Sequence, residues 1–301
     1  MALNRIQWKG EESFRILSYY FTVRWNDQAA GERILYTLSD FGVPPDPAEH
    51  PEIWAPGVPP QYSIVRRRTG PYYYALLYGD AVMAKGKNAG EVLARLFWHV
   101  NTLTLRLSSD FLLIHAGSVS TQAGEGILLP ARSGGGKTTL VTALVRAGFQ
   151  YLSDEGGAVD PFSQTLYPYP RALTLKQGHK QVFPELCGRN GSDWYEGVRW
   201  IHPREIRPDA VGGPCPIRFV IAPEYRPGAQ TELTPISPAQ AAVELLTHAI
   251  NLTRYRSRAI PLVAEVARRA QRYRLVSGNL DEAVQAIVEL TGRRRRVPRA
   301  G

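Results

Sequence analysis

The sequence has few of the features that mark secreted or membrane-bound proteins. It contains two cysteines, Cys187 and Cys215, which are too few for a disulfide framework and too far apart for a zinc site. No run approaches the roughly 18 apolar residues that a membrane span needs. The opening residues, MALNRIQWKGEESF, introduce charges before any apolar segment and do not match a signal peptide. These absences predict a protein of the cytoplasm, with no membrane partner.

The positive charge of the chain is unevenly placed. The net charge is +9, and arginines cluster at residues 66–68 and again at residues 293–299. No basic face interleaved with aromatic residues and no known nucleic-acid module is present, so the sequence predicts no nucleic-acid partner. Two interpretations of the clusters stay open: a solvated tail with a surface patch, or a surface that steers an anionic nucleotide or an acidic peptide.

The character of the sequence changes near residue 108. Before it, residues 13–25 are rich in strand-forming types, and residues 90–108 repeat apolar side chains at helical spacing. After it, near-continuous apolar runs such as FLLIHAGSVS and GILLP alternate with helical patterns, as in strands that are covered on both faces. We therefore predict a smaller N-terminal α+β domain over residues 1–108, which could bind substrate, and an α/β domain over residues 109–301.

The segment LPARSGGGKTTLVTAL, residues 129–144, predicts a phosphate-binding loop between a strand and a helix. Glycine lets successive backbone N–H groups converge, and the helix directs its unpaired N–H groups and positive dipole end to the same point. Lys137 would add a charge for the outer phosphates, and the Thr138 hydroxyl could ligate Mg²⁺. Ala131 replaces the first glycine of the usual G-x-x-x-x-G-K-[ST] pattern. The alternative is a flexible turn that happens to contain a lysine.

Three further residues are candidates for chemistry. Asp154 and Glu155 end the next predicted strand, where one carboxylate could hold a metal ion and the other could face an incoming hydroxyl. The alternative for such a pair is a solvated turn. His115 lies within an apolar strand, where a histidine is either a catalyst or a hydrogen-bonded core residue.

These residues, in their order and spacing, resemble the HPr kinase/phosphorylase family. The resemblance combines His-x-Gly at His115, the loop form [GA]-x-S-G-x-G-K-[ST] from Ala131 to Thr138, and the carboxylate pair at Asp154. It implies an α/β P-loop kinase domain of the HPr kinase/phosphoenolpyruvate carboxykinase type, a mixed sheet with flanking helices. Towards the C-terminus the chain is similar to short HPr-kinase-related proteins of biosynthetic clusters, including lasso-peptide kinases.

The resemblance implies roles for individual residues, with ATP and Mg²⁺ as cofactors. Asp154 would be the base that accepts the substrate proton, supported by His115, and Glu155 with Thr138 would bind Mg²⁺. Arg171 and Lys176 are candidates for a cation that stabilises the transition state. The residues implied in phosphate binding are Ser133, Gly134, Gly135, Gly136, Lys137, Thr138 and Thr139.

The expected activity is transfer of the γ-phosphoryl group of ATP to a serine-type hydroxyl, of a peptide or protein such as a lasso-type precursor. Arg132 stands where the family has an aspartate, and the E-x-R-G stretch of true HPr kinases is missing, so the acceptor is left open. The alternatives are a non-catalytic nucleotide-gated regulator or scaffold, a small-metabolite kinase and a plain NTPase. A homo-oligomer also stays open.

Overall fold

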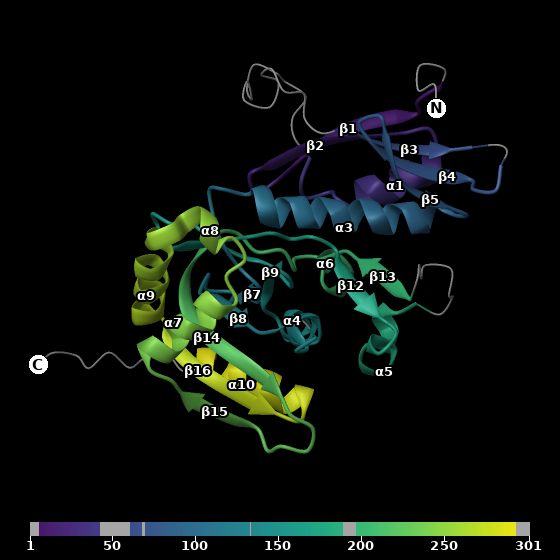
Figure 1. Cartoon of the computed structure of the whole chain (residues 1–301). Coiled ribbons are helices and arrows are strands. Elements are labelled where there is room, and N and C mark those ends of the chain that lie inside the picture. The colour runs from purple at the N-terminus through teal and green to yellow at the C-terminus, as the bar shows by residue number, and fades with distance from the viewer. Residues whose placement is uncertain (1–5, 43–60, 68–69, 133, 189–196, 293–301) are drawn as a thin grey trace, which may run out of the picture. The chain divides into compact units, whose positions relative to one another are not determined.

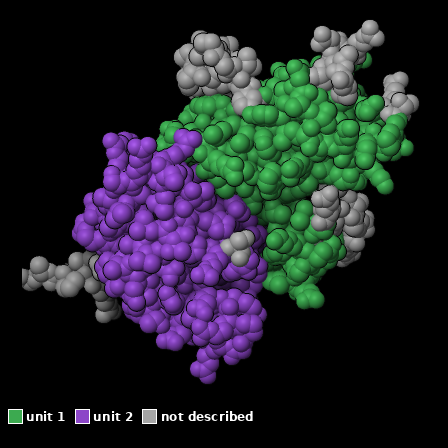
Figure 2. All heavy atoms as spheres, viewed as in Figure 1, with its two compact units in different colours: residues 1–110, 171–202 green, residues 111–170, 203–301 purple. Residues whose placement is uncertain are grey.

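The computed structural model describes residues 6–42, 61–67, 70–132, 134–188 and 197–292. The chain forms two compact units, each of which is discontinuous in sequence (Figure 2). Unit 1 comprises residues 1–110 and 171–202, and unit 2 comprises residues 111–170 and 203–301. The proline-rich segment 43–60, the arginine-rich tail from residue 293 and Ser133 lie outside the described residues.

Unit 1 contains a five-stranded sheet of order β1-β2-β3-β4-β5, in which only β2 and β3 run parallel (Figure 1). Its elements are β1 (Gly10–Ile16), β2 (Tyr19–Trp25), α1 (Gln28–Thr37), β3 (Gln61–Arg66), β4 (Tyr74–Tyr78), β5 (Ala81–Gly86), α3 (Ala89–Leu107), β12 (Leu173–Lys176), α5 (His179–Val182), the 3₁₀ helix η2 (Pro184–Leu186) and β13 (Val198–Ile201). The predicted helix over residues 90–108 is α3, which buries Val92, Leu93, Leu96 and Val100.

Residues 171–202 belong to unit 1, whereas the sequence assigned them to the C-terminal domain. Two contacts of this segment show why. The Trp200 ring lies 5.3 Å from the Phe97 ring of α3, and His202 Nε2 lies 2.7 Å from Asp40 Oδ2. Both partners come from far earlier in the chain, so no local pattern in residues 171–202 reveals this membership.

Unit 2 is built on a mixed sheet to which nine strands of its described residues contribute. The order is β6-β10-β11-β14-β8-β7-β9, and β16 also pairs with β14 and with β15. Its elements are β6 (Leu112–Ile114), β7 (Ala116–Ser120), β8 (Gly126–Pro130), α4 (Lys137–Arg146), β9 (Gln150–Ser153), β10 (Gly157–Val159), β11 (Thr165–Tyr167), α6 (Pro203–Ile206), β14 (Cys215–Tyr225), β15 (Glu232–Pro235), α7 (Pro238–Thr247), α8 (Leu252–Tyr255), the 3₁₀ helix η4 (Arg256–Arg258), α9 (Ala259–Arg269), β16 (Gln271–Ser277) and α10 (Leu280–Gly292).

The helices of unit 2 flank this sheet (Figure 1). Helices α7 and α9 contribute Leu245, Val263 and Val266 to one core cluster with the strands. Helix α4 packs against β7 and β9 and also contacts α10. The fold is therefore mixed α/β with flanking helices, as predicted. In the described part of the chain, no helix combines the length and the apolar character that crossing a membrane requires.

The contact between β7 and α4 depends on a glycine. A Cβ added at Gly117 would lie 2.6 Å from Cγ2 of Val141, whose branched side chain has little rotamer freedom in a helix. We expect Gly117→Ala to lower the free energy of unfolding by about 1–3 kcal/mol, because it overpacks this contact. Urea unfolding measures the loss. Gly213→Ala is the matched control, since a Cβ there meets nothing within 4 Å, and an equal loss in both variants would contradict the prediction.

Candidate functional site

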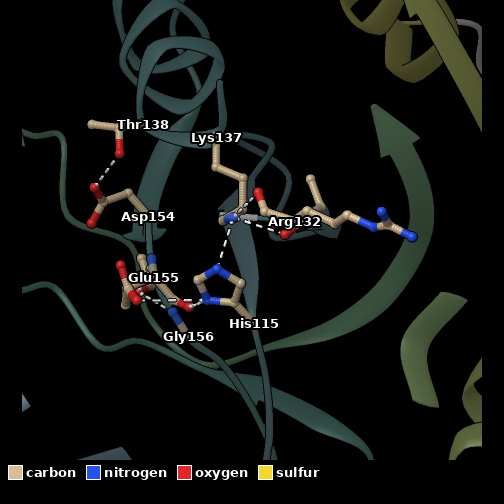
Figure 3. Close-up of polar contacts among 9 residues, drawn as sticks. His115, Arg132, Lys137, Thr138, Asp154, Glu155 and Gly156 are labelled. Carbon is tan, nitrogen blue, oxygen red and sulfur yellow. Dashed lines mark hydrogen bonds and ion pairs between the residues drawn. The ribbon is translucent and has the colours of Figure 1, made fainter. Parts of the chain in front are cut away.

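The glycine loop leads from the buried strand β8 into α4 (Figure 3). Gly134 and Gly136 have φ angles of 81° and 79°, in the left-handed region that favours glycine, and a Cβ at either would meet nothing within 4 Å. The Gly135 N–H donates to the Arg132 carbonyl at 3.0 Å and closes a tight turn. The backbone around the start of α4 is thus free of side-chain bulk, as an anion site requires.

Lys137, the first residue of α4, is buried, with 7% of its surface exposed. Its Nζ donates to the carbonyls of Ala131 at 2.8 Å and Arg132 at 2.9 Å, and lies 3.0 Å from His115 Nε2 (Figure 3). Burial lowers the pKa of Lys137, while the nearby charges of Glu155 and Asp154 act in the opposite direction.

His115 links the glycine loop to the acid pair. It lies between β6 and β7, and its Nδ1 is 3.2 Å from the backbone oxygen and 3.6 Å from Oε1 of Glu155. A carbonyl oxygen only accepts hydrogen bonds, so Nδ1 carries the proton and Nε2 is the acceptor for the Lys137 ammonium. Burial lowers the pKa of His115, the Lys137 charge lowers it further, and the Glu155 charge opposes both. The contacts with Glu155 and Lys137 therefore place the proton of the neutral His115 ring on Nδ1.

Asp154 follows β9 and faces the beginning of α4. Its side chain is buried, with 2% of the residue exposed. Oδ2 accepts a hydrogen bond from the Thr138 hydroxyl at 2.8 Å, and Oδ1 accepts one from the Tyr151 hydroxyl at 3.0 Å (Figure 3 draws the first). The strand end with the acid pair therefore lies beside the glycine loop.

The turn after β9 directs the two carboxylates to different partners. The Ser153 hydroxyl accepts hydrogen bonds from the N–H groups of Glu155 at 3.2 Å and Gly156 at 3.1 Å. In this turn Asp154 points to Thr138, and Glu155 points to His115 (Figure 3). The sequence prediction paired Thr138 with Glu155 as metal ligands, whereas the Thr138 hydroxyl bonds to Asp154. The side chain of Glu155 is 29% exposed and so remains more accessible than that of Asp154.

Tyr151 is a residue of this site that the sequence analysis missed. It is fully buried, and its hydroxyl donates a hydrogen bond to the Asp154 carboxylate. The sequence carried a usable signal, because a tyrosine inside a buried strand normally needs a partner for its hydroxyl. The carboxylates of Asp154 and Glu155 come directly after this strand.

Removing the Tyr151 hydroxyl should destabilise the protein. A hydrogen bond to a charged acceptor contributes about 1.5–3 kcal/mol, and we expect Tyr151→Phe to lower the free energy of unfolding by this amount. Urea unfolding tests it, with Tyr167→Phe as the control. Within the described residues the Tyr167 hydroxyl makes no hydrogen bond, so its removal should change little. Equal unfolding free energies for the two variants would refute the assignment.

The remaining predicted residues belong to different parts of the chain. Thr139 is in the first turn of α4, and Ser133 is outside the described residues. Arg171 and Lys176 belong to unit 1, where Lys176 ends β12 and its backbone N–H donates to His179 Nδ1 at 2.9 Å. Their predicted role as transition-state cations stays a prediction.

The donor set fits a cation that is shared with phosphate. Among the described residues, no group of three or more His, Cys, Asp or Glu side chains could hold a metal ion. A hydroxyl and a carboxylate, here Thr138 and Asp154, are hard oxygen ligands of the kind that Mg²⁺ combines with substrate phosphates and waters. No protein-family model and no curated protein sequence matches this chain.

Proposed function

We propose that this protein is an ATP-dependent kinase that transfers the γ-phosphoryl group to a serine-type hydroxyl of a peptide or protein. The observation that carries the proposal is the 2.8 Å hydrogen bond between Thr138 and Asp154. It joins the hydroxyl that follows the loop lysine to an acid from a neighbouring strand. Phosphoryl transfer requires mainly alignment and charge neutralisation, and this arrangement supplies groups for both.

Unit 2 would bind the nucleotide. The backbone N–H groups at the start of α4 and the Lys137 ammonium would hold the phosphates, and Thr138 with one carboxylate of the acid pair would hold Mg²⁺. When bound, Mg²⁺ would neutralise phosphate charge and orient the transferred group. Holding the phosphoryl donor and the acceptor hydroxyl in the reacting geometry lowers the activation free energy by about 7–11 kcal/mol.

The two carboxylates would have different roles, one as a metal ligand and the other as the base. The sequence-based hypothesis makes Asp154 the base and Glu155 the metal ligand. The contacts favour the reverse, because Asp154 is buried beside the Thr138 hydroxyl, while Glu155 is more exposed and lies near His115. We therefore propose that Asp154 helps to hold Mg²⁺ and that Glu155 faces the acceptor hydroxyl.

The finer fold and the substrate are parts of the same proposal. The order strand β8, glycine loop, α4, with the acid pair after β9, supports a P-loop kinase domain of the HPr kinase/phosphoenolpyruvate carboxykinase type. Unit 1, with its separate sheet, is proposed as the module that binds a peptide acceptor such as a lasso-type precursor. The acceptor rests on the family resemblance and not on a site within the described residues.

Intact-mass measurement tests the activity. Candidate peptides encoded by neighbouring genes are incubated with the protein, ATP and Mg²⁺, and a phosphate-sized mass increment supports the proposal, provided that the increment forms far more slowly with the Lys137→Met variant. Phosphate release that no peptide accelerates would indicate an NTPase. Nucleotide binding with neither transfer nor hydrolysis would indicate a regulator or scaffold, and an increment on a small metabolite would indicate a metabolite kinase.

A further inference from the structure

The ammonium group of Lys137 has no hydrogen left for a phosphate. A lysine ammonium carries three N–H donors and no acceptor. Three protein acceptors surround Nζ at 2.8, 2.9 and 3.0 Å: the carbonyls of Ala131 and Arg132 and the Nε2 of His115. A phosphate oxygen that binds Lys137 must therefore displace one of the three.

His115 is the acceptor that can leave most easily. Ala131 is 6% exposed, and a buried carbonyl that loses its donor costs about 1–3 kcal/mol. The Arg132 carbonyl belongs to the turn that it closes with Gly135. The His115 side chain is 23% exposed, so its Nε2 can exchange the ammonium for water or for a substrate group. The loop carbonyls would thus stay bonded while the imidazole is released.

We propose that Lys137 and His115 form a latch that polyphosphate opens. The inference rests on the proposed function, since it assumes that the glycine loop binds phosphate. Binding moves one N–H of Lys137 from Nε2 of His115 to a phosphate oxygen. The ring keeps its orientation through Nδ1 and Glu155, and its Nε2 becomes a free hydrogen-bond acceptor beside the acid pair. The site thereby acquires an acceptor for an incoming hydroxyl only after the nucleotide has bound.

Pyrophosphate binding to His115 variants tests the latch without any need for catalysis. His115→Phe removes the acceptor and leaves one donor of Lys137 unpaired, so we expect it to bind pyrophosphate about tenfold more tightly, as loss of one competing hydrogen bond predicts. In His115→Gln the amide oxygen can take the place of Nε2, and its affinity should stay near that of the parent. His248→Gln is the matched control, because the His115 N–H donates to the backbone oxygen of His248 at 2.7 Å, which the substitution keeps, while His248 Nδ1 lies 2.8 Å from the backbone oxygen of Glu244.

The outcomes separate the latch from the proposed function. Unchanged or weaker pyrophosphate binding by His115→Phe would overturn the latch and leave the kinase proposal standing. Failure of the parent protein to bind pyrophosphate or ATP would overturn both. If His115→Phe does not fold, the unmodified protein decides: at constant pH, the ¹⁵N resonance of His115 Nε2, assigned with His115→Gln, should move towards the position of a free acceptor as pyrophosphate saturates the site. A resonance that does not move would refute the latch.

Discussion

Replacing Lys137 with methionine should lower phosphoryl transfer by about 10²–10³-fold, the usual loss when a site loses one group that stabilises developing charge. Methionine keeps the length and apolar stem of the side chain but removes the cation next to the glycine loop. Nucleotide affinity should fall as well, because the variant loses the ammonium that lies against the carbonyls of the glycine loop. Calorimetric titration with ATP and the intact-mass assay measure the two effects.

Arg132→Met is the matched control for this variant. Arg132 is also a cation of the loop, but its side chain is exposed and points away from the acid pair (Figure 3). We expect only a small change in transfer for Arg132→Met. Lys137→Met also leaves acceptors such as the Ala131 carbonyl without their donor, so its stability must be compared with that of the parent. A folded Lys137→Met variant with parental transfer would exclude the glycine loop as the nucleotide site.

The second large effect distinguishes the two carboxylates. If Asp154 is a ligand of Mg²⁺, Asp154→Asn should abolish transfer at ordinary Mg²⁺ concentrations. Part of the activity should return as the Mg²⁺ concentration is raised, because the substitution lowers the affinity for the metal. With Glu155 on the acceptor side, Glu155→Gln should lose about 10²–10⁴-fold at every Mg²⁺ concentration, the range for loss of a general base. Affinity for Mg²⁺-ATP should stay near the parental value in Glu155→Gln.

The measurement is transfer rate against Mg²⁺ concentration, with nucleotide affinity determined for each variant. The reversed pattern, with a metal-dependent loss in Glu155→Gln and a metal-independent loss in Asp154→Asn, would support the assignment made from the sequence. Parental transfer in both variants would argue against any kinase chemistry at this acid pair. Tyr151→Phe should resemble Asp154→Asn in direction but with a smaller effect, because it removes one donor from the Asp154 carboxylate.

The latch bears on the order in which the site would engage the nucleotide and the acceptor hydroxyl. While the Lys137 ammonium donates to Nε2 of His115, this nitrogen cannot accept a hydrogen bond from water or from an acceptor hydroxyl. Binding of polyphosphate would free Nε2 of His115 at the same time as the Lys137 ammonium bonds to a phosphate oxygen. The resting arrangement therefore links nucleotide binding to the readiness of the acceptor side through one hydrogen bond.

Much of the local structure could be predicted from the sequence. The pattern of β8, glycines and the amphipathic segment after Lys137 specified a strand, a loop and a helix, because glycine conformations and apolar spacing are properties of neighbouring residues. Helix α7 begins with a capping box, a motif of neighbouring residues in which Ser237 and Gln240 exchange hydrogen bonds of 3.2 and 2.9 Å. Helix α3 was likewise visible in its spacing.

The pairing of side chains was decided by the tertiary structure alone. Strands β9 and β10 are consecutive in the chain, yet β9 pairs with β7, whereas β10 pairs with β6 and β11. The strand partners change at the turn that carries the acid pair, and in this turn Asp154 is directed towards Thr138 and Glu155 towards His115. Sequence spacing brought both acids to the loop but contained no information on which faces which.

The composition and local patterns of this chain thus determined its elements, its glycine loop and the types of side chain at the site. Only the three-dimensional fold decided that residues 171–202 join unit 1, that Tyr151 holds Asp154 and that Lys137 is engaged with His115. The physical reason is range: backbone preference and apolar periodicity act between residues close in sequence. Hydrogen bonds between side chains depend on the order in which distant strands pack.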